Sequence, residues 1–176
     1  PLVFLRPRNI RFLKWEYIDF GKKVINLPAS ELKTNKPLAV PLATQAITIL
    51  NEIQPLTGNG EYVFVSGHSR NGQPLSENST TQALRRFINP TTGEKFGTGY
   101  MTSHGFRHMA STMLNELGYD PDVIELQLAH INKDRIRAVY NKAQLWDKRV
   151  TMMQAWADYL DGLKSANNVI PIRKAG

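Results

Sequence analysis

The stretch that decides the fold is SHGFRHMASTMLNELGYDPDVIELQLAH, residues 103–130. Its apolar spacing predicts a helix over residues 103–117, and Gly118 is typical of the position just after a helix C-terminus. Asp120 and Pro121 then predict the start of a second helix, because proline is favoured at the first helical position. The stretch therefore indicates two consecutive helices joined by a tight turn.

Downstream of this stretch the pattern stays helical. A short helix is expected over residues 135–140, and a long amphipathic helix carries apolar side chains from Leu145 to Leu160. The remaining sequence is mostly polar and ends basic. We therefore assign residues 1–162 to one domain and residues 163–176 to a C-terminal tail.

Upstream, the sequence predicts a β-hairpin. Val24 to Leu27 and Leu38 to Leu42 are short apolar runs typical of strands, and the polar segment PASELKTNKP joins them. The fold class is therefore mainly α with a small antiparallel β-sheet (α+β). The further elements expected are a helix over 10–15, a short strand over 62–65, and helices capped by Thr44 and Ser76 that run to 53 and 88.

The length of 176 residues and the hydrophobic fraction of 41% fit one globular domain. The chain begins at Pro1 instead of methionine, so we expect it to be part of a longer protein. No apolar run approaches the roughly 18 residues of a membrane span, and no signal-peptide pattern opens the chain. We therefore expect no membrane association.

The charge balance points to a polyanionic partner. The chain has 22 Lys and Arg against 15 Asp and Glu, a net charge of +7 and a pI of about 9.7. Such an excess of basic charge favours a nucleic acid. No basic stretch is interleaved with aromatic residues, which favours duplex over single-stranded DNA.

The absence of cysteine excludes disulfides, thiolate zinc sites and cysteine nucleophiles. Histidine remains as a possible metal ligand, but His104 and His108 lack the glutamate of an H-E-x-x-H motif. We therefore expect neither a metal nor another cofactor.

Six residues stand out as candidates for chemistry, although each alone also has an ordinary structural explanation. His104 and Arg107 lie three apart, so they share one face of a helix. His130 would also suit a helix C-terminus, where a cation stabilises the helix dipole. The candidates are Arg6, Lys33, His104, Arg107, His130 and Tyr140.

The order and spacing of these residues resemble the tyrosine recombinase (phage integrase) family. The resemblance rests on LRPRNIRFLKW, LKTNKPLAVPL, SHGFR and LAH, followed by Tyr140, and extends over about residues 1–160. LNELGYDPDVIELQLAH, RAVYNKA and MMQAWADYLD are similar to prophage and genomic-island integrases. The resemblance implies the fold of the family's C-terminal catalytic domain without its first helices, and DNA-binding domains upstream in the intact protein.

The resemblance also implies a role for each candidate. Tyr140 matches the nucleophile, and Arg6 and Arg107 match the arginines that bind the scissile phosphate. His104 matches a supporting histidine, and His130 matches the last histidine of the site. Lys33 matches a hairpin lysine suited to be the general acid. One position departs from the family, which often has an acidic residue where this chain has Asn9, so the orientation of Arg6 is less secure. His108 is expected to be incidental.

These residue types suit a phosphodiester exchange without a metal. A phenol can store the bond energy in a covalent intermediate, and guanidinium groups can bind the non-bridging oxygens of the phosphate. The implied function is that of a site-specific recombinase that cuts and rejoins duplex DNA through a 3′-phosphotyrosine, to integrate or excise a prophage or genomic island. Two alternatives stay open: a DNA-binding module with a lapsed site, suggested by Asn9, and a topoisomerase.

The resemblance extends to partners and setting. It implies double-stranded DNA at attachment sites, a homotetramer on that DNA, an excisionase, a host DNA-bending protein and the bacterial cytoplasm. Residues 163–176 would either dock on a neighbouring copy or fray. Some of the remaining basic residues are expected to follow DNA phosphates, among Arg8, Arg11, Lys14, Lys36, Arg70, Arg85, Arg86, Lys95, Lys133, Arg135 and Arg137.

Overall fold

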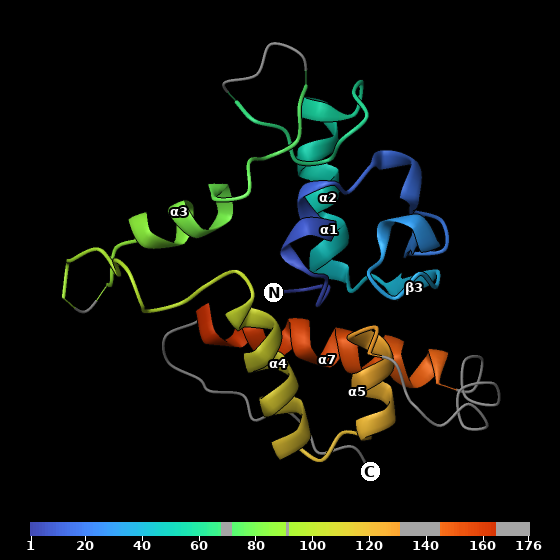
Figure 1. Ribbon diagram of the computed structural model, residues 1–176. Helices are drawn as coiled ribbons and strands as arrows, with labels where there is room; N and C mark the ends of the chain where they lie inside the picture. The colour runs from blue at the N-terminus through green and yellow to red at the C-terminus, as the bar shows by residue number, and fades with distance from the viewer. Residues whose placement is uncertain (68–71, 91, 131–144, 165–176) are drawn as a thin grey trace.

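The computed structural model describes residues 1–67, 72–90, 92–130 and 145–164 (Figure 1). The helix expected over residues 135–140 lies outside these ranges. The elements are, in order, α1 (Pro7–Arg11), η1 (Trp15–Tyr17), β1 (Ile18–Asp19), β2 (Val24–Leu27), η2 (Ala29–Glu31), β3 (Leu38–Pro41), α2 (Thr44–Thr57), α3 (Ser79–Arg86), α4 (Gly105–Glu116), α5 (Pro121–Gln127) and α7 (Trp146–Lys164).

A three-stranded antiparallel sheet in the order β1-β2-β3 forms in the N-terminal half. The predicted hairpin is confirmed: Ile25 pairs with Val40, and Leu27 pairs with Leu38. These four side chains are buried, so the apolar pattern of both strands specifies their register. Strand β1 has two residues and is too short to show an alternating pattern in the sequence.

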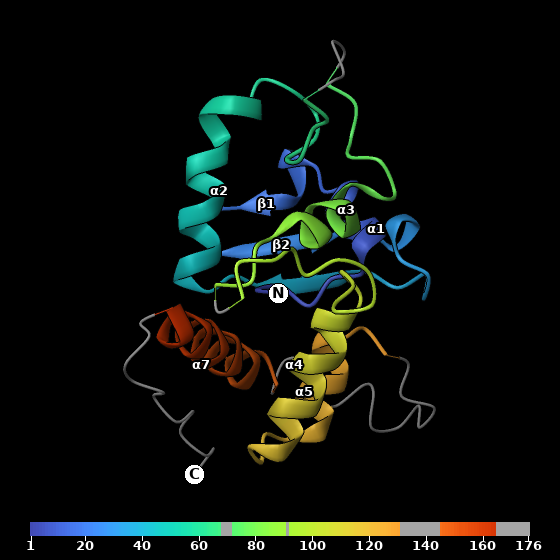
Figure 2. The ribbon, with the colours of Figure 1, turned by 90° about the vertical axis from the view of Figure 1, so that its left-hand side faces the viewer.

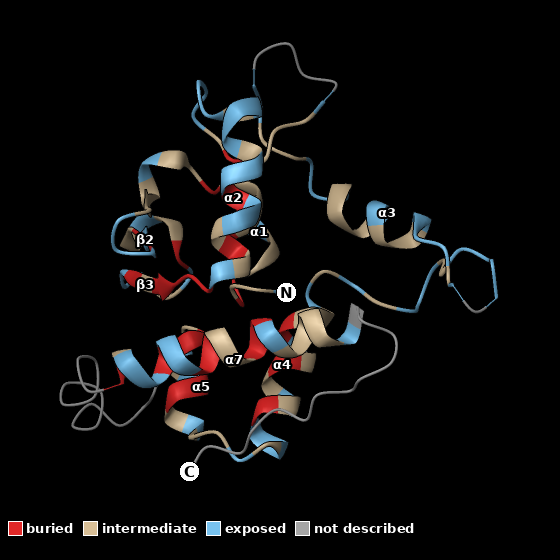
Figure 3. Cartoon of the chain, turned by 180° about the vertical axis from the view of Figure 1, so that it is seen from behind, coloured by how far each residue is buried: buried red, intermediate tan, exposed pale blue. Residues whose placement is uncertain are grey.

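Two hydrophobic cores support the fold. The sheet and α2 enclose the first, which includes Val40 and Val63, and Figure 2 shows α2 beside the sheet. Helices α4, α5 and α7 enclose the second, which includes Leu114 and Trp156. Figure 3 shows buried residues on all three of these helices. Helix α7 also contacts α2 and β3, so it connects the two halves.

The N-terminal segment reaches both cores: Phe4 lies in the second, whereas its neighbour Leu5 lies in the first. The Phe4 ring meets the Trp156 ring edge-on at 5.8 Å between centroids, and Trp156 Nε1 donates to the carbonyl of Pro1 at 3.4 Å. Phe4 has a φ of 53°, a left-handed backbone conformation that is rare for a residue with a side chain. The N-terminal segment therefore lies against the C-terminal helices before the chain turns into α1.

The stretch 103–130 folds as its sequence predicts. Helix α4 begins at Gly105, whose N–H donates to Thr102 Oγ1 at 3.0 Å. Gly118, just beyond the end of α4, has a φ of 82°. Asp120 caps α5 by accepting the N–H of Asp122 at 3.0 Å, directly before the helix-initiating proline.

Two predicted elements are wrong, the helix over 10–15 and the strand over 62–65. The first helix is α1, at Pro7–Arg11 instead of 10–15, because Pro7 starts the helix and the chain is already extended at Lys14. The stretch 62–65 forms no strand, because it makes only single bridges, from Tyr62 to Lys14 and from Val65 to Pro74.

Some predicted helix ends also shift. Thr44 is the first residue of α2 and not its cap, because its hydroxyl donates to Gln154 Oε1 on α7 at 3.2 Å. Helix α3 starts at Ser79 and ends at Arg86, before two exposed apolar residues that the prediction had included, Phe87 and Ile88. Helix α7 continues past residue 162, the assigned end of the domain, to Lys164.

Candidate active site

Arg107 is a buried cation at the meeting point of three segments. It lies in the first turn of α4, is 7% exposed, and donates from Nη1 to the carbonyl of Phe4 and from Nη2 to the carbonyl of Leu128. Burial, and then the charge of Arg6, lowers the pKa of Arg107 to about 10, so it stays protonated at neutral pH. Arg107 therefore places a fixed positive charge between the N-terminal segment and the end of α5.

Arg6 precedes α1 and adds a second positive charge. Its extended backbone leads into Pro7, and its carbonyl accepts the N–H of Ile10 at 3.1 Å, which starts the helix. The charge of Arg6 lowers the pKa of both Arg107 and His104, so the three side chains lie within electrostatic range of one another. Two adjacent guanidinium groups are suited to hold an oxyanion such as a phosphodiester.

His104 stands at the N-cap position of α4, three residues before Arg107, and is exposed. Partial desolvation of its ring lowers its pKa, and the neighbouring charges of His108, Arg107 and Arg6 lower it further. The shift favours the neutral imidazole, which can accept a proton. His108, expected to be incidental, lies 4.7 Å from it between ring centroids, in an edge-to-face contact.

A left-handed turn at the end of α5 carries His130. The N–H of Ala129 donates to Leu126 at 3.1 Å, and the N–H of His130 donates to Glu125 at 3.0 Å, which is the Schellman pattern of a helix C-terminus. Ala129 occupies the position usually taken by glycine, with a φ of 50°. Because the preceding carbonyl, of Leu128, binds Arg107, the same turn ties the position of His130 to that of Arg107.

Glu125 is a site residue that sequence reasoning missed. Its Oε2 lies 2.7 Å from His130 Nδ1, and its charge partly offsets the lowering of the Arg107 pKa. Residues five apart do not share a face of a regular helix, so only the left-handed turn brings these two together. The carboxylate therefore holds the His130 ring by its Nδ1.

Lys33 lies in the hairpin turn, and Asn9 of α1 contacts the same turn at Glu31. Lys33 is exposed in the turn between η2 and β3, and within the described residues no hydrogen bond or ion pair holds it. Asn9 is buried, and its Nδ2 donates to the carbonyl of Glu31 at 2.7 Å, two residues before Lys33. The residue that stands in place of the expected acid thus joins α1, which follows Arg6, to the hairpin that carries Lys33.

Tyr140 lies outside the described residues. Of the other candidates, Arg6, His104 and Arg107 lie within electrostatic range of one another. His130 is tied to Arg107 through the end of α5, and Lys33 lies on the hairpin that α1 contacts. Their chemical roles stay predictions.

The charges of the site favour an anion over a metal ion. In the part of the chain that the structure describes, no group of three or more His, Asp or Glu residues is arranged to hold a metal.

None of the helices in the same ranges has the length and apolar composition needed to cross a membrane.

Comparison with known proteins gives a family match over most of the chain. Residues 3–145 match the family model described as "Phage integrase family". The chain is 37% identical over 169 residues to "Prophage integrase IntA" of Escherichia coli (strain K12), covering 96% of this chain and 39% of that protein. It is also 37% identical over 158 residues to "Integrase" of Shigella phage Sf6, covering 89% of this chain and 39% of the relative. The chain thus spans about two fifths of the length of these relatives.

Solved structures share the fold. The Tn1549 transposon integrase, in complex with a circular intermediate DNA, aligns with a TM-score of 0.59 at 18% identity, over 84% of this chain and 55% of that chain. XerA recombinase aligns with a TM-score of 0.58 at 21% identity, over 85% of this chain and 53% of the other. The predicted fold class, mainly α with a small antiparallel sheet in the fold of a tyrosine recombinase catalytic domain, is confirmed.

Proposed function

Because the chain belongs to the phage integrase family, we propose that it is the catalytic part of a tyrosine-type site-specific recombinase that integrates or excises a prophage or genomic island. The observation that supports the proposal is buried Arg107, held at the end of α5 with Arg6 and His104 within electrostatic range. A cluster of guanidinium groups without a metal suits the binding of a scissile phosphate.

The first step is attack by Tyr140 on that phosphate. The phenol oxygen bonds to phosphorus, the bond from phosphorus to the 5′-oxygen breaks, and the 3′ end of the strand stays attached to the protein. The phenol, with an ordinary pKa of about 10, must lose its proton during attack. Neutral His104 can take part in this transfer, and Lys33 supplies the proton that the leaving 5′-oxygen needs.

The arginines stabilise the transition state. Negative charge grows on the non-bridging oxygens as phosphorus becomes five-coordinate, and Arg6 and Arg107 bind those oxygens. Arg107 is already fixed by the carbonyls of Phe4 and Leu128, so little reorganisation is needed during the reaction. His130, held by Glu125, adds a further hydrogen bond to the same phosphate.

The second step reverses the first with a different strand. The 5′-hydroxyl of the recombining strand attacks the phosphotyrosine, the phosphodiester re-forms, and Tyr140 recovers its proton. The covalent bond conserves the energy of the broken phosphodiester, so the exchange needs no ATP.

The proposal extends to the assembly. We place four copies on two DNA duplexes, with residues 163–176 as a docking segment between neighbours and with an excisionase and a host DNA-bending protein as partners. The setting is the bacterial cytoplasm. Removal of residues 163–176 should weaken tetramer formation on DNA, measured by native gel shift, while cleavage of a single site persists. Unchanged assembly would contradict the docking role.

A nicked suicide substrate tests the chemistry, because the released 5′ fragment diffuses away and traps the covalent adduct. Wild type should form a protein–DNA adduct that survives denaturation, and Tyr140→Phe should form none. Tyr100→Phe is the matched control, since Tyr100 is 66% exposed and lies outside the site. Equal adduct from Tyr140→Phe would show that the nucleophile is misassigned. DNA binding without any wild-type adduct would favour the lapsed module, and relaxed plasmid without recombinants would favour a topoisomerase.

A further inference from the structure

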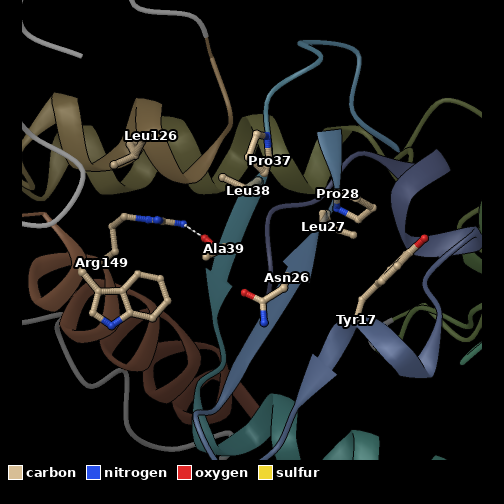
Figure 4. A pocket seen from close by; sticks show the side chains of 10 residues that line it. Tyr17, Asn26, Leu27, Pro28, Pro37, Leu38, Ala39, Leu126 and Arg149 are labelled. Carbon is tan, nitrogen blue, oxygen red and sulfur yellow. Dashed lines mark hydrogen bonds between the residues drawn. The ribbon is translucent and has the colours of Figure 1, made fainter. Parts of the chain in front are cut away.

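Arg149 is a buried arginine that the proposed mechanism does not use. It lies in the first turns of α7 and is 4% exposed. Its Nη2 donates to the carbonyl of Ala39 on β3 at 2.6 Å, and Nε and Nη2 donate to Gln127 Oε1 at 3.0 and 2.7 Å. Figure 4 shows the guanidinium reaching Ala39 beside an apolar cavity that Leu38 and Leu126 help to line. Arg149 therefore joins α7, α5 and the hairpin.

A charge in this place is costly. Among the described residues, no carboxylate pairs with Arg149, and burial lowers its pKa to about 10. Removing an ion from water costs several kcal/mol, and a well-packed apolar side chain of similar volume often serves stability as well or better. Packing alone does not account for a guanidinium here, so the reason for its presence is sought in the groups to which it donates hydrogen bonds.

Gln127 connects Arg149 to the active site. It is fully buried at the end of α5, and the two bonds from Arg149 to its oxygen fix which way the amide faces. The amide nitrogen then donates to the carbonyl of Val3 at 3.3 Å. Phe4, which follows Val3, and Leu128, which follows Gln127, each accept a hydrogen bond from Arg107 through their carbonyls.

These contacts close a ring. One path from Arg107 runs through Leu128 to its neighbour Gln127, and the other runs through Phe4 to its neighbour Val3, where the Gln127 amide joins them. The ring fixes the two carbonyls that aim the Arg107 guanidinium.

We propose that Arg149 and Gln127 are positioning residues of the recombinase site: Arg149 orients the Gln127 amide, Gln127 holds the segment before Arg6 against the end of α5, and both set the direction of Arg107. Through Ala39 the same pair connects the site to β3, whose hairpin carries Lys33. The inference rests on the proposed function, because its readout is the rate of strand cleavage.

Gln127→Glu separates the two ends of the amide. The carboxylate still accepts from Arg149 and supplies the missing countercharge, but it has no N–H to give to Val3 and repels that carbonyl. We expect an unchanged or higher Tm, DNA affinity within about twofold of wild type, and adduct formation on the suicide substrate slowed at least tenfold. Lys148→Met is the matched control, because Lys148 is an exposed neighbour paired with Asp120 and should change none of the three.

A second variant guards against misfolding. The double variant Arg149→Met with Gln127→Leu removes the charge and the amide at the same time. An apolar pair of similar volume replaces them, so the packing is kept. Cleavage should again fall at least tenfold at retained Tm and DNA affinity. Wild-type cleavage by both variants would overturn the inference, and so would a loss of cleavage that only follows a loss of Tm.

Hydrogen exchange separates failure of the inference from failure of the proposed function. Backbone amides of residues 2–6 should exchange faster in Gln127→Glu than in wild type, with those of α2 unchanged. Wild-type protein that binds DNA without forming an adduct would refute the proposed function, whereas unchanged exchange at residues 2–6 would refute the ring itself.

Discussion

Replacement of Arg107 by lysine should lower both stability and activity, by amounts that follow from its two carbonyl partners. Arg107→Lys keeps the charge but offers one donor group in place of a rigid fork, so it can serve Phe4 or Leu128 but not both. A buried carbonyl left without a partner costs about 1–3 kcal/mol. For a domain of this size each kcal/mol corresponds to about 2–4 °C in Tm, so we expect a fall of about 2–12 °C.

The catalytic effect should exceed the effect on stability. Loss of a preorganised donor to the transition state costs about 10²–10³ in rate, which is more than partial unfolding explains well below the Tm. Thermal unfolding followed by circular dichroism gives the first quantity, and the rate of adduct formation at 25 °C gives the second. Arg86→Lys, the same substitution at an exposed position of α3, is the control. A Tm within about 1 °C of wild type would refute the argument from buried carbonyls.

Three further changes test the end of α5 and the start of α4. Glu125→Gln should slow adduct formation severalfold by releasing the His130 ring, yet change Tm little, because the pair is half-exposed; an unchanged rate would exclude an orienting role. Ala129→Gly should raise the free energy of unfolding by about 0.5–1 kcal/mol in urea denaturation, since glycine adopts its positive φ without strain; a loss would contradict this. The pKa of His104 is lowered on folding, so the unfolded chain binds more protons and stability falls as pH drops below the ordinary value of 6.5. His104→Gln should therefore lose less Tm than wild type between pH 7 and pH 5, and equal losses would exclude His104 as a source of the pH dependence.

The sequence predicts those elements whose local chemistry agrees with their packing. Gly118 and Asp120 end one helix and start the next by local hydrogen bonds and backbone preference, and both features are confirmed. The 62–65 stretch has the composition of a strand but finds only single bridging partners. A pattern along the chain reports which residues are apolar, not whether a neighbouring strand is there to pair with them.

The candidate site likewise has a part that the sequence predicts and a part that it does not. Arg6, His104, Arg107 and His130 are recognisable from residue type and order, because their chemistry depends on side chains. Their supports depend on backbone carbonyls and on turns that residue type does not encode. Glu125 reaches His130 only through a left-handed turn, and Gln127 acts on carbonyls that belong to ordinary apolar residues.

The packing of Phe4 and Pro1 on Trp156 has a consequence for synthesis on the ribosome. These partners are separated by up to 155 positions along the chain, so residues 1–4 cannot settle until helix α7 has been synthesised. Phe4 is also one of the two carbonyl ligands of Arg107. We expect that a nascent chain has no ordered active site until α7 has left the exit tunnel.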